Sequence, residues 1–320
     1  MWISMCSCLS IIPCPKHSLD NKIPRKGVST MQHYLAIDIG GTSIKYGVVQ
    51  TDGTLLSNDH VPTPKTWKAF LEQIDAIVNN TQAAGPIQGI AFSAPGAVDS
   101  STGVIHGVTA LPYIHEQPFL EPFQDQYDLP VTVLNDANAA ALAEGWTGAA
   151  ASLKRYATVV IGTGVGGAFI DSNEVMVGSH FHGGEYGYWI LDPNAPHPDG
   201  TWSKVGATAV LVKRCSDRLG LPLTGKDVFD LQSDSRIHEE LENFYRWNAI
   251  GLYNLQFGLD PERILIGGGI SRRPEVRDGI KRHLDALTDS FGTFRIDVET
   301  CAHFNEANLI GAVRFHLLTN

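Results

Sequence analysis

The chain has 320 residues, of which 43% are apolar and 18% are charged, so it can bury the core of one large domain or of two ordinary ones. Its formal net charge of −10 is a poor match for nucleic acid or for an anionic membrane surface. No apolar run approaches the roughly 18 residues that a membrane-spanning helix needs. We therefore expect neither a nucleic-acid partner nor a membrane partner.

The cysteines are unevenly distributed. Cys6, Cys8 and Cys14 lie at the start of the chain, and Cys215 and Cys301 are isolated. This pattern is no disulfide framework and is typical of a cytoplasmic protein. Residues 1–30 lack the basic start and the unbroken apolar stretch of a signal peptide. We expect them to form a disordered leader, or an upstream extension of a protein that starts at Met31.

From Met31 onward, the first part of the chain alternates between strand and helix patterns. The sequence predicts strands at 34–40, 42–50, 89–96 and 131–136, an amphipathic helix at 65–83 and an alanine-rich helix at 137–146. The pattern then begins again, with a strand, a glycine turn and a returning strand at 157–171, a helix at 239–257 and a strand at 263–271. The two halves therefore show weak internal symmetry. Residues 178–204 lack periodicity, and we expect functional loops there.

The stretch GTGVGG at 162–167 follows a strand and fits the dinucleotide template G-x-G-x-x-G, with Glu185 about 20 residues further on. That template requires a helix after the glycines, where the helix N-terminus would hold a pyrophosphate. The residues that follow, AFIDSNEVMV, instead predict another hairpin. We therefore do not expect a nicotinamide enzyme.

Two glycine turns of this kind, one in each half, favour phosphate binding. Glycines remove side-chain obstruction and let several backbone N–H groups point at one anion. Thr42 and Thr163 add hydroxyl donors, Asp38 lies beside the first turn, and three glycines end the strand at 267–269. Either turn taken alone could be no more than a tight hairpin.

Six motifs occur in one order and spacing: DIGGT at 38–42, SAPGAVD at 93–99, LNDANAAALAE at 134–144, IGTGVGG at 161–167, GGEYG at 183–187 and IGGGIS at 266–271. In this combination the chain resembles the ROK family of sugar kinases and regulators from Met31 to about Val313. The resemblance implies an α/β fold of two ribonuclease-H-like domains, of the actin/hexokinase-like ATPase class, around a central cleft. We expect an N-terminal domain at 31–148 and a C-terminal domain at 149–320, whose final helix packs back on the first domain.

The resemblance also implies a site for ATP, Mg²⁺ and a sugar. The implied nucleotide contacts are Asp38, Gly40, Gly41, Thr42, Lys45, Gly162, Thr163, Gly164, Gly267, Gly268 and Gly269. Asp38 would hold Mg²⁺ through water. The implied sugar contacts are Pro95, Gly96, Asn135, Glu185 and Tyr188. A homodimer is common in the family.

Asp136 ends an apolar strand and opens a helix, whose N-terminus favours an ionised carboxylate. From its position alone, the residue could be only a helix N-cap. Together with the resemblance, it is our candidate for the catalytic base that accepts the proton of a sugar hydroxyl.

The chain departs from the family pattern after Glu185. Tyr188 stands where many members have histidine, Ser203 where a sugar-binding glutamate is usual, and residues 189–206 contain no zinc-binding cysteines. His180, His182 and His197 match no common zinc spacing, so we expect no zinc. Either a glucokinase has rebuilt these contacts, or the pocket is open at C1 for a β-glucoside, which we slightly favour. Tyr186, Tyr188, Trp189 and Trp202 would then be platforms for a second ring, unless they belong to the core.

We therefore predict an ATP- and Mg²⁺-dependent sugar kinase that acts at the 6-hydroxyl of a β-glucoside or hexose. The alternatives are a glucokinase or another hexose or N-acetylhexosamine kinase, and a non-catalytic ROK sugar sensor or regulator. A regulator's DNA-binding module would need roughly 60 residues before DIGGT, but only 37 precede Asp38. A sensor would be expected to lack Asp136 or a phosphate loop, and the chain has all of them.

Overall fold

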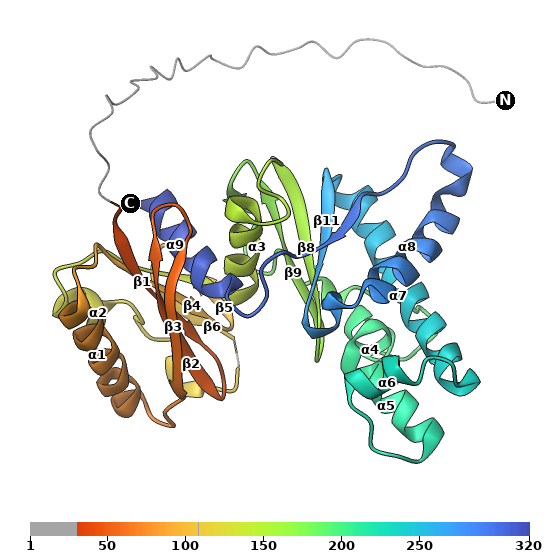
Figure 1. Cartoon of the computed structure of the whole chain (residues 1–320), viewed down its shortest axis with the longest axis horizontal. Helices are drawn as coiled ribbons and strands as arrows, with labels where there is room; N and C mark the ends of the chain where they lie inside the picture. Colours follow the sequence, from red (N-terminus) through yellow and green to blue (C-terminus); the bar gives the residue numbers. More distant parts are fainter. Residues whose placement is uncertain (1–30, 108) are drawn as a thin grey trace, which may run out of the picture. The chain divides into compact units, whose positions relative to one another are not determined.

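The computed structural model describes residues 31–107 and 109–320, so the predicted leader at 1–30 lies outside the described residues. None of the described helices combines the length and the apolar character needed to span a bilayer. The strands of the described residues form two five-stranded sheets and one two-stranded sheet. The two large sheets, one early and one late in the chain, lie apart in Figure 1.

The first sheet has the strand order β3-β2-β1-β4-β7. Its strands are β1 (His33–Ile39), β2 (Ser43–Gln50), β3 (Leu55–Pro62), β4 (Ile90–Ala94) and β7 (Val131–Asn135). Strands β1, β2 and β3 pair antiparallel, whereas β1, β4 and β7 run parallel. The parallel strands are nearly continuous apolar runs because both faces of the sheet are covered.

The helix α1 (Trp67–Ala84) begins where the Thr66 side chain caps the Ala69 N–H, and it buries Phe70, Ile74, Ile77 and Val78 against one sheet face. The other face packs against α9 (Ala307–Thr319), which contacts β1, β4 and α3 (Asp136–Thr147). Figure 1 shows α9 in blue beside the red and orange strands. The last helix therefore packs on the first sheet. Between β4 and β7 lie β5 (Ala97–Asp99), β6 (Val104–His106), the 3₁₀ turn η1 (Pro112–Ile114) and α2 (Glu121–Gln126).

The second sheet repeats the pattern with the order β10-β9-β8-β11-β12. Its strands are β8 (Arg155–Ile161), β9 (Val165–Asp171), β10 (Glu174–Val175), β11 (Arg263–Gly267) and β12 (Val298–Thr300). Strands β8, β9 and β10 pair antiparallel, and β8, β11 and β12 run parallel. The internal symmetry is confirmed. The strand β9 begins at Val165, within the glycine segment 162–167, and no helix starts there, so the dinucleotide template does not apply.

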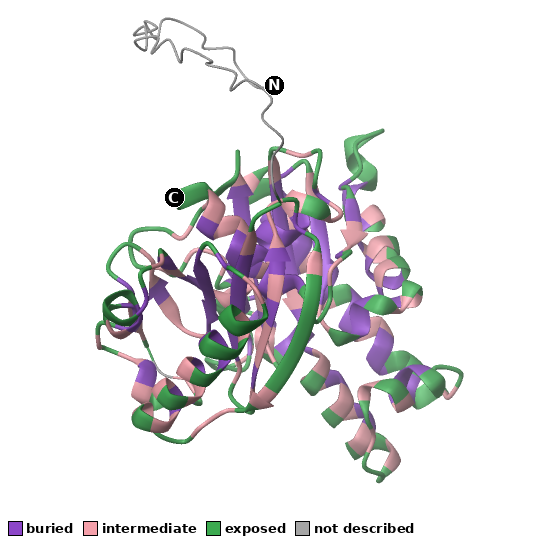
Figure 2. Cartoon of the chain, turned by 60° about the vertical axis from the view of Figure 1, so that its left-hand side comes forward, coloured by how far each residue is buried: buried purple, intermediate pink, exposed green. Residues whose placement is uncertain are grey.

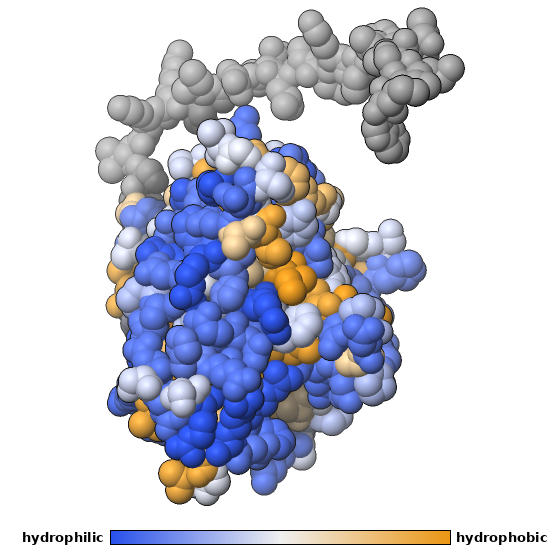
Figure 3. All heavy atoms as spheres, turned by 90° about the vertical axis from the view of Figure 1, so that its right-hand side faces the viewer, coloured by the Kyte–Doolittle hydropathy of each residue, from blue (hydrophilic) through white to orange (hydrophobic). Residues whose placement is uncertain are grey.

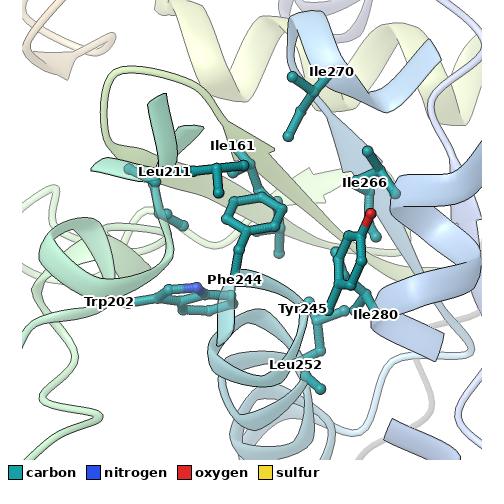
Figure 4. Packing of buried hydrophobic residues seen from close by; sticks show 14 of the residues in the cluster. Ile161, Trp202, Leu211, Phe244, Tyr245, Leu252, Ile266, Ile270 and Ile280 are labelled. Carbon is teal, nitrogen blue, oxygen red and sulfur yellow. The ribbon is translucent and has the colours of Figure 1, made fainter. Parts of the chain in front are cut away.

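Helices cover this second sheet and pack with it around a hydrophobic core. They are α4 (Trp202–Gly206), α5 (Thr208–Leu219), α6 (Gly225–Asp230), α7 (Ser235–Leu259) and α8 (Pro274–Thr288), with 3₁₀ turns η2 (Tyr186–Tyr188), η3 (Gly269–Arg272) and η4 (Asp289–Phe291). The helix α7 is longer than the predicted 239–257 because Asp234 caps its first turn. Figure 4 shows Trp202, Phe244, Leu252 and Ile266 packed together in this core.

Two of the predicted sugar platforms belong to this core. Trp202 is fully buried, and its Nε1–H donates to Asn248 Oδ1 at 2.9 Å. Tyr186 is 3% exposed and packs edge-on against Trp189. The platform interpretation is therefore wrong for Tyr186 and Trp202, because the residues around them pack as interior although their sequence lacks a clear period.

The surface follows the usual division between buried sheets and half-exposed helices. In Figure 2 the strands are mostly purple, for buried, and the outer helices carry green, exposed faces. The side of the molecule that carries α7 and α8 is mainly hydrophilic, with one larger apolar area near its middle and smaller ones at its edges (Figure 3). Among the exposed apolar side chains, Phe257, Phe291 and Phe294 contact one another.

Candidate active site

The junction between β7 and α3 positions the candidate base. Asn135 Oδ1 accepts the Asn138 N–H at 3.1 Å, so Asn135 is the helix N-cap and Asp136 is the first helical residue. Asp136 Oδ1 accepts from the Ala137 N–H at 2.8 Å and from Asn135 Nδ2 at 3.0 Å. Among the described residues, Asp136 Oδ2 receives no hydrogen bond, so this oxygen is available to a hydroxyl group.

Burial raises the pKa of Asp136 from its ordinary 3.8 to about 6. The negative charges of Asp38 and Glu185 raise this pKa as well, while the donors on Ala137 and Asn135 lower it. The predicted preference for the ionised form at a helix N-terminus is thus outweighed, and the net shift of the pKa is opposite to our expectation. A carboxylate with this pKa is still mostly ionised at pH 7, and it accepts a proton more readily than an ordinary aspartate does.

Asp38 is held by residues from three elements. The parallel register places Asp38 of β1 opposite Ser93 of β4. Asp38 Oδ1 accepts from Ser93 Oγ and from Asn308 Nδ2, both at 2.9 Å, and Lys45 Nζ lies 3.9 Å from Oδ2. Among the described residues, the other carboxylate oxygen, Oδ2, has only this long ionic contact. Sequence reasoning missed Asn308, because it lies 270 residues from Asp38 and no local motif marks it.

A cavity of about 710 Å³ lies beside Asp136. Its volume falls within the range of roughly 300–1,000 Å³ that is typical of small-molecule sites. Both predicted glycine segments of the second half line it: Gly162, Thr163, Gly164, Gly267, Gly268 and Gly269. Gly268 has a φ of +99°, and a Cβ there would lie 2.3 Å from the Ile161 carbonyl oxygen. The sequence needs glycine at this position, and the backbone forms part of the cavity wall.

The first hairpin does not line this cavity. Gly40 N donates to Ser43 O at 3.0 Å, and a Cβ on Gly40 would lie 2.7 Å from the same oxygen, so the turn is tight. Gly41 and Thr42 are exposed. Neither cavity lining contains any of the predicted contacts from this part of the chain, namely Asp38, Gly40, Gly41, Thr42 and Lys45. The link is Asn308, which lines the large cavity and binds Asp38.

A second, smaller cavity of about 150 Å³ also has Asp136 in its lining. Gly96, Asn135, Asp136 and Glu185 from the prediction line it, as does Phe181, which the prediction did not include. Gly96 has a φ of +106°, and its carbonyl accepts from Asn135 Nδ2 at 3.0 Å. Asp136 thus borders both cavities.

Two predicted sugar contacts lie elsewhere. Pro95 is absent from both cavity linings, although it directly precedes Gly96. Tyr188 is 74% exposed and lines neither cavity. The structure therefore does not bring these two side chains together with Glu185 at the small cavity.

The histidines near this region do not gather around a common point. His180, His182 and His197 are exposed. Within residues 31–107 and 109–320, no group of three or more His, Cys, Asp or Glu side chains has the arrangement to hold a metal ion.

A buried carboxylate supports the far wall of the large cavity. Glu144 on α3 is 1% exposed and accepts the N–H groups of Ala149, Ala302 and His303 at 2.7–3.0 Å. It thereby fixes the segment that carries Phe304, over whose ring Arg272 lies at 4.1 Å. Sequence reasoning did not single out these residues, because the contacts join segments far apart in the chain.

Comparison with known proteins agrees with this geometry. The ROK family model matches residues 34–317. A β-glucoside kinase from Listeria monocytogenes is 34% identical over 292 residues, which is 88% of this chain and 96% of that protein. A ROK family protein from Streptococcus pneumoniae in complex with sucrose has a TM-score of 0.82 at 34% identity and covers 90% of this chain and 99% of its own. A ROK family glucokinase from Streptomyces griseus in complex with glucose and AMPPNP has a TM-score of 0.74 at 26% identity and covers 88% of this chain and 98% of its own.

Proposed function

The chain belongs to the ROK family, and from this premise we propose that it is a kinase that transfers the γ-phosphate of ATP to the 6-hydroxyl of a β-glucoside. Family membership confirms the predicted α/β fold of the actin/hexokinase-like ATPase class. The domain boundary near residue 148 stays a prediction. The observation that carries the proposal is the position of Asp136, on the border between a cavity of nucleotide size and a smaller one.

The relatives support each substrate class. The Listeria monocytogenes relative is named a β-glucoside kinase, and the Streptomyces griseus structure holds AMPPNP, an ATP analogue, together with glucose. The Streptococcus pneumoniae structure holds sucrose, which is a disaccharide. Together they favour ATP as donor and a sugar as acceptor. The identity to the β-glucoside kinase is higher than that to the glucokinase, which favours a β-glucoside over glucose.

In the proposed reaction, Asp136 Oδ2 orients the acceptor hydroxyl and takes its proton as the oxygen attacks the γ-phosphate. Because Oδ1 is held by Ala137 and Asn135, the free oxygen has a defined direction. The reaction therefore requires an ionised Asp136. Closure of the two domains around the sugar would exclude water and limit ATP hydrolysis.

The large cavity fits ATP with Mg²⁺. Backbone groups of Gly162, Gly164 and Gly268 line it without side-chain obstruction, and Thr163 adds a hydroxyl. Asp38 is a buried carboxylate with one lightly engaged oxygen, which suits the water-mediated binding of a hard cation. When bound, Mg²⁺ neutralises charge on the phosphates. The first hairpin, with Gly40, Gly41, Thr42 and Lys45, would complete the phosphate site from the opposite side.

In the small cavity, Glu185 would bind sugar hydroxyls through its carboxylate, and Gly96 lets the backbone approach the ring. Asn135 uses its amide for Gly96 and Asp136, so within this proposal it holds the sugar-facing backbone and the base in place. Contacts from Pro95 and Tyr188, a homodimer, and the absence of nucleic-acid partners stay predictions.

The proposal is tested by measuring ADP release with Mg-ATP and glucose, cellobiose, gentiobiose, an aryl β-glucoside, fructose, mannose, N-acetylglucosamine or N-acetylmannosamine as acceptor. We expect β-glucosides to have a higher kcat/KM than glucose. Turnover of glucose alone would instead identify a glucokinase. No turnover, together with a sugar-induced rise in Tm, would identify a sensor.

The base is tested with Asp136→Asn. This variant should bind sugar yet lose turnover by a factor of about 10²–10⁴, the usual contribution of a general base. Near wild-type turnover would reject the assignment of Asp136 as the base.

A further inference from the structure

The small cavity has room for only part of a β-glucoside. Its volume of about 150 Å³ is roughly half the lower limit for sites that enclose a whole drug-sized ligand. If the phosphorylated glucose occupies it with its 6-hydroxyl at Asp136, the group attached at C1 must lie at the cavity rim. The side chains at that rim then decide whether the enzyme prefers β-glucosides to glucose.

Phe181 is an aromatic side chain in the lining of this cavity, and its backbone is unusual. Its φ of +58° lies in the left-handed region, which a bulky residue rarely adopts because the backbone is strained there. The flanking glycines Gly178 and Gly183 belong to the same loop. A strained aromatic residue at a cavity wall indicates that the position of its ring matters more than the local backbone energy.

The ring of Phe181 contacts a second ring from another part of the chain. It stacks on the imidazole of His106, with ring centroids 6.0 Å apart and an interplanar angle of 18°. His106 ends β6, and its Nδ1 lies 3.1 Å from Glu116 Oε2, which fixes the direction of the imidazole. His106 therefore supports one face of the Phe181 ring from a separate segment, and Phe181 itself lines the cavity together with Gly96, Asp136 and Glu185.

We propose that Phe181, backed by His106, is the platform for the group at C1 of the substrate, either the second sugar ring of a β-linked disaccharide or an aryl aglycone. The axial hydrogens of a β-linked pyranose give it two apolar faces, and an aromatic ring favours a flat apolar partner. Free glucose lacks the second ring and gains nothing from this surface. The inference rests on the proposed sugar kinase function, because that function sets the orientation of glucose in the cavity.

The other aromatic residues in this region fit the role less well. Tyr186 is enclosed by the core, and Trp202 is hydrogen-bonded to Asn248 within it. Tyr188 is exposed but lies outside both cavity linings. Phe181 combines partial exposure with a place in the cavity wall.

The test compares the wild type with Phe181→Ala, Phe181→Tyr and Tyr188→Ala. The readout is the ratio of kcat/KM for cellobiose to kcat/KM for glucose, together with the ratio of the two Kd values from calorimetry. Phe181→Ala should lower the preference for cellobiose about tenfold by both measures, because ring stacking is lost. Phe181→Tyr keeps the ring and should stay within about threefold of the wild type. Phe291→Ala, an exposed phenylalanine outside both cavities, controls for the loss of an aromatic side chain.

Several results would overturn the inference. One is an unchanged cellobiose preference in folded Phe181→Ala, and another is a loss that occurs in Tyr188→Ala instead. If the wild type transfers no phosphate but binds both sugars, the proposed function fails and the Kd ratio still decides the platform. A wild type that binds neither sugar overturns both.

Discussion

Asp136→Asn should stabilise the protein at neutral pH, although it removes the proposed base. Burial raises the pKa of Asp136 to about 6 from an ordinary 3.8, and each unit of pKa is worth about 1.4 kcal/mol. Keeping Asp136 ionised in the folded state therefore costs up to about 3 kcal/mol. Asparagine is neutral, and its Oδ1 can still accept from Ala137 and Asn135.

The stabilisation by Asp136→Asn should depend on pH, because the pKa of Asp136 differs between the folded and the unfolded state. Below about pH 4 the carboxyl is protonated in both the folded and the unfolded state, so the wild type and the variant should unfold at similar temperatures. As pH rises through about 6, the wild type loses the favourable contribution of the neutral carboxyl and the variant does not. Above pH 7 the variant should have a Tm higher by roughly 5–10 °C.

The measurement is thermal unfolding, followed by circular dichroism, of both proteins from pH 4 to pH 8. Asp125→Asn replaces an exposed carboxylate on α2 and serves as the matched control, with Tm values that follow those of the wild type at every pH. If the Tm values of Asp136→Asn also follow the wild type throughout, Asp136 is not destabilised by burial, and the raised pKa cannot be part of its function.

Three further variants test the surroundings of the base and the phosphate site. Glu185→Gln removes a negative charge that raises the pKa of Asp136, so the acid limb of kcat/KM against pH should move to lower pH; an unmoved limb would exclude this coupling. Asn308→Ala removes one of two donors to Asp38, and the Mg²⁺ concentration for half-maximal rate should rise about tenfold, with the KM for sugar as the control. Gly268→Ala combines a φ of +99° with a carbonyl clash and should lower both Tm and ATP affinity, whereas Gly269→Ala, which points into open space, should keep the wild-type Tm.

The sequence could predict the features that depend on neighbouring residues. The hairpin at 157–171 follows from strand patterns on either side of its glycines, and the helix after Asp136 follows from its alanines. The sheet register that pairs Asp38 with Ser93, and the contact from Asn308, depend on the assembled fold. No local pattern in the sequence could show either.

The failures of prediction have physical reasons as well. Trp202 lies in a stretch without helical period, yet it is buried against α7, where Gly251 has no Cβ to obstruct it. The pKa of Asp136 depends on burial and on the charges of Asp38 and Glu185, which no local motif reports. The prediction did not include Phe181, because neither its backbone conformation nor its contact with His106 can be read from the sequence.

The chain passes between its two sheets twice, once after α3 and once before α9, and Glu144 binds the backbone of both passages. Two halves joined by one linker could rotate about many axes. Two linkers held at one carboxylate restrict the rotation to axes that pass near that carboxylate. We therefore expect any closing motion of the halves to be a rotation about Glu144. Asp136 lies about two helical turns before Glu144 on α3 and would move together with that helix.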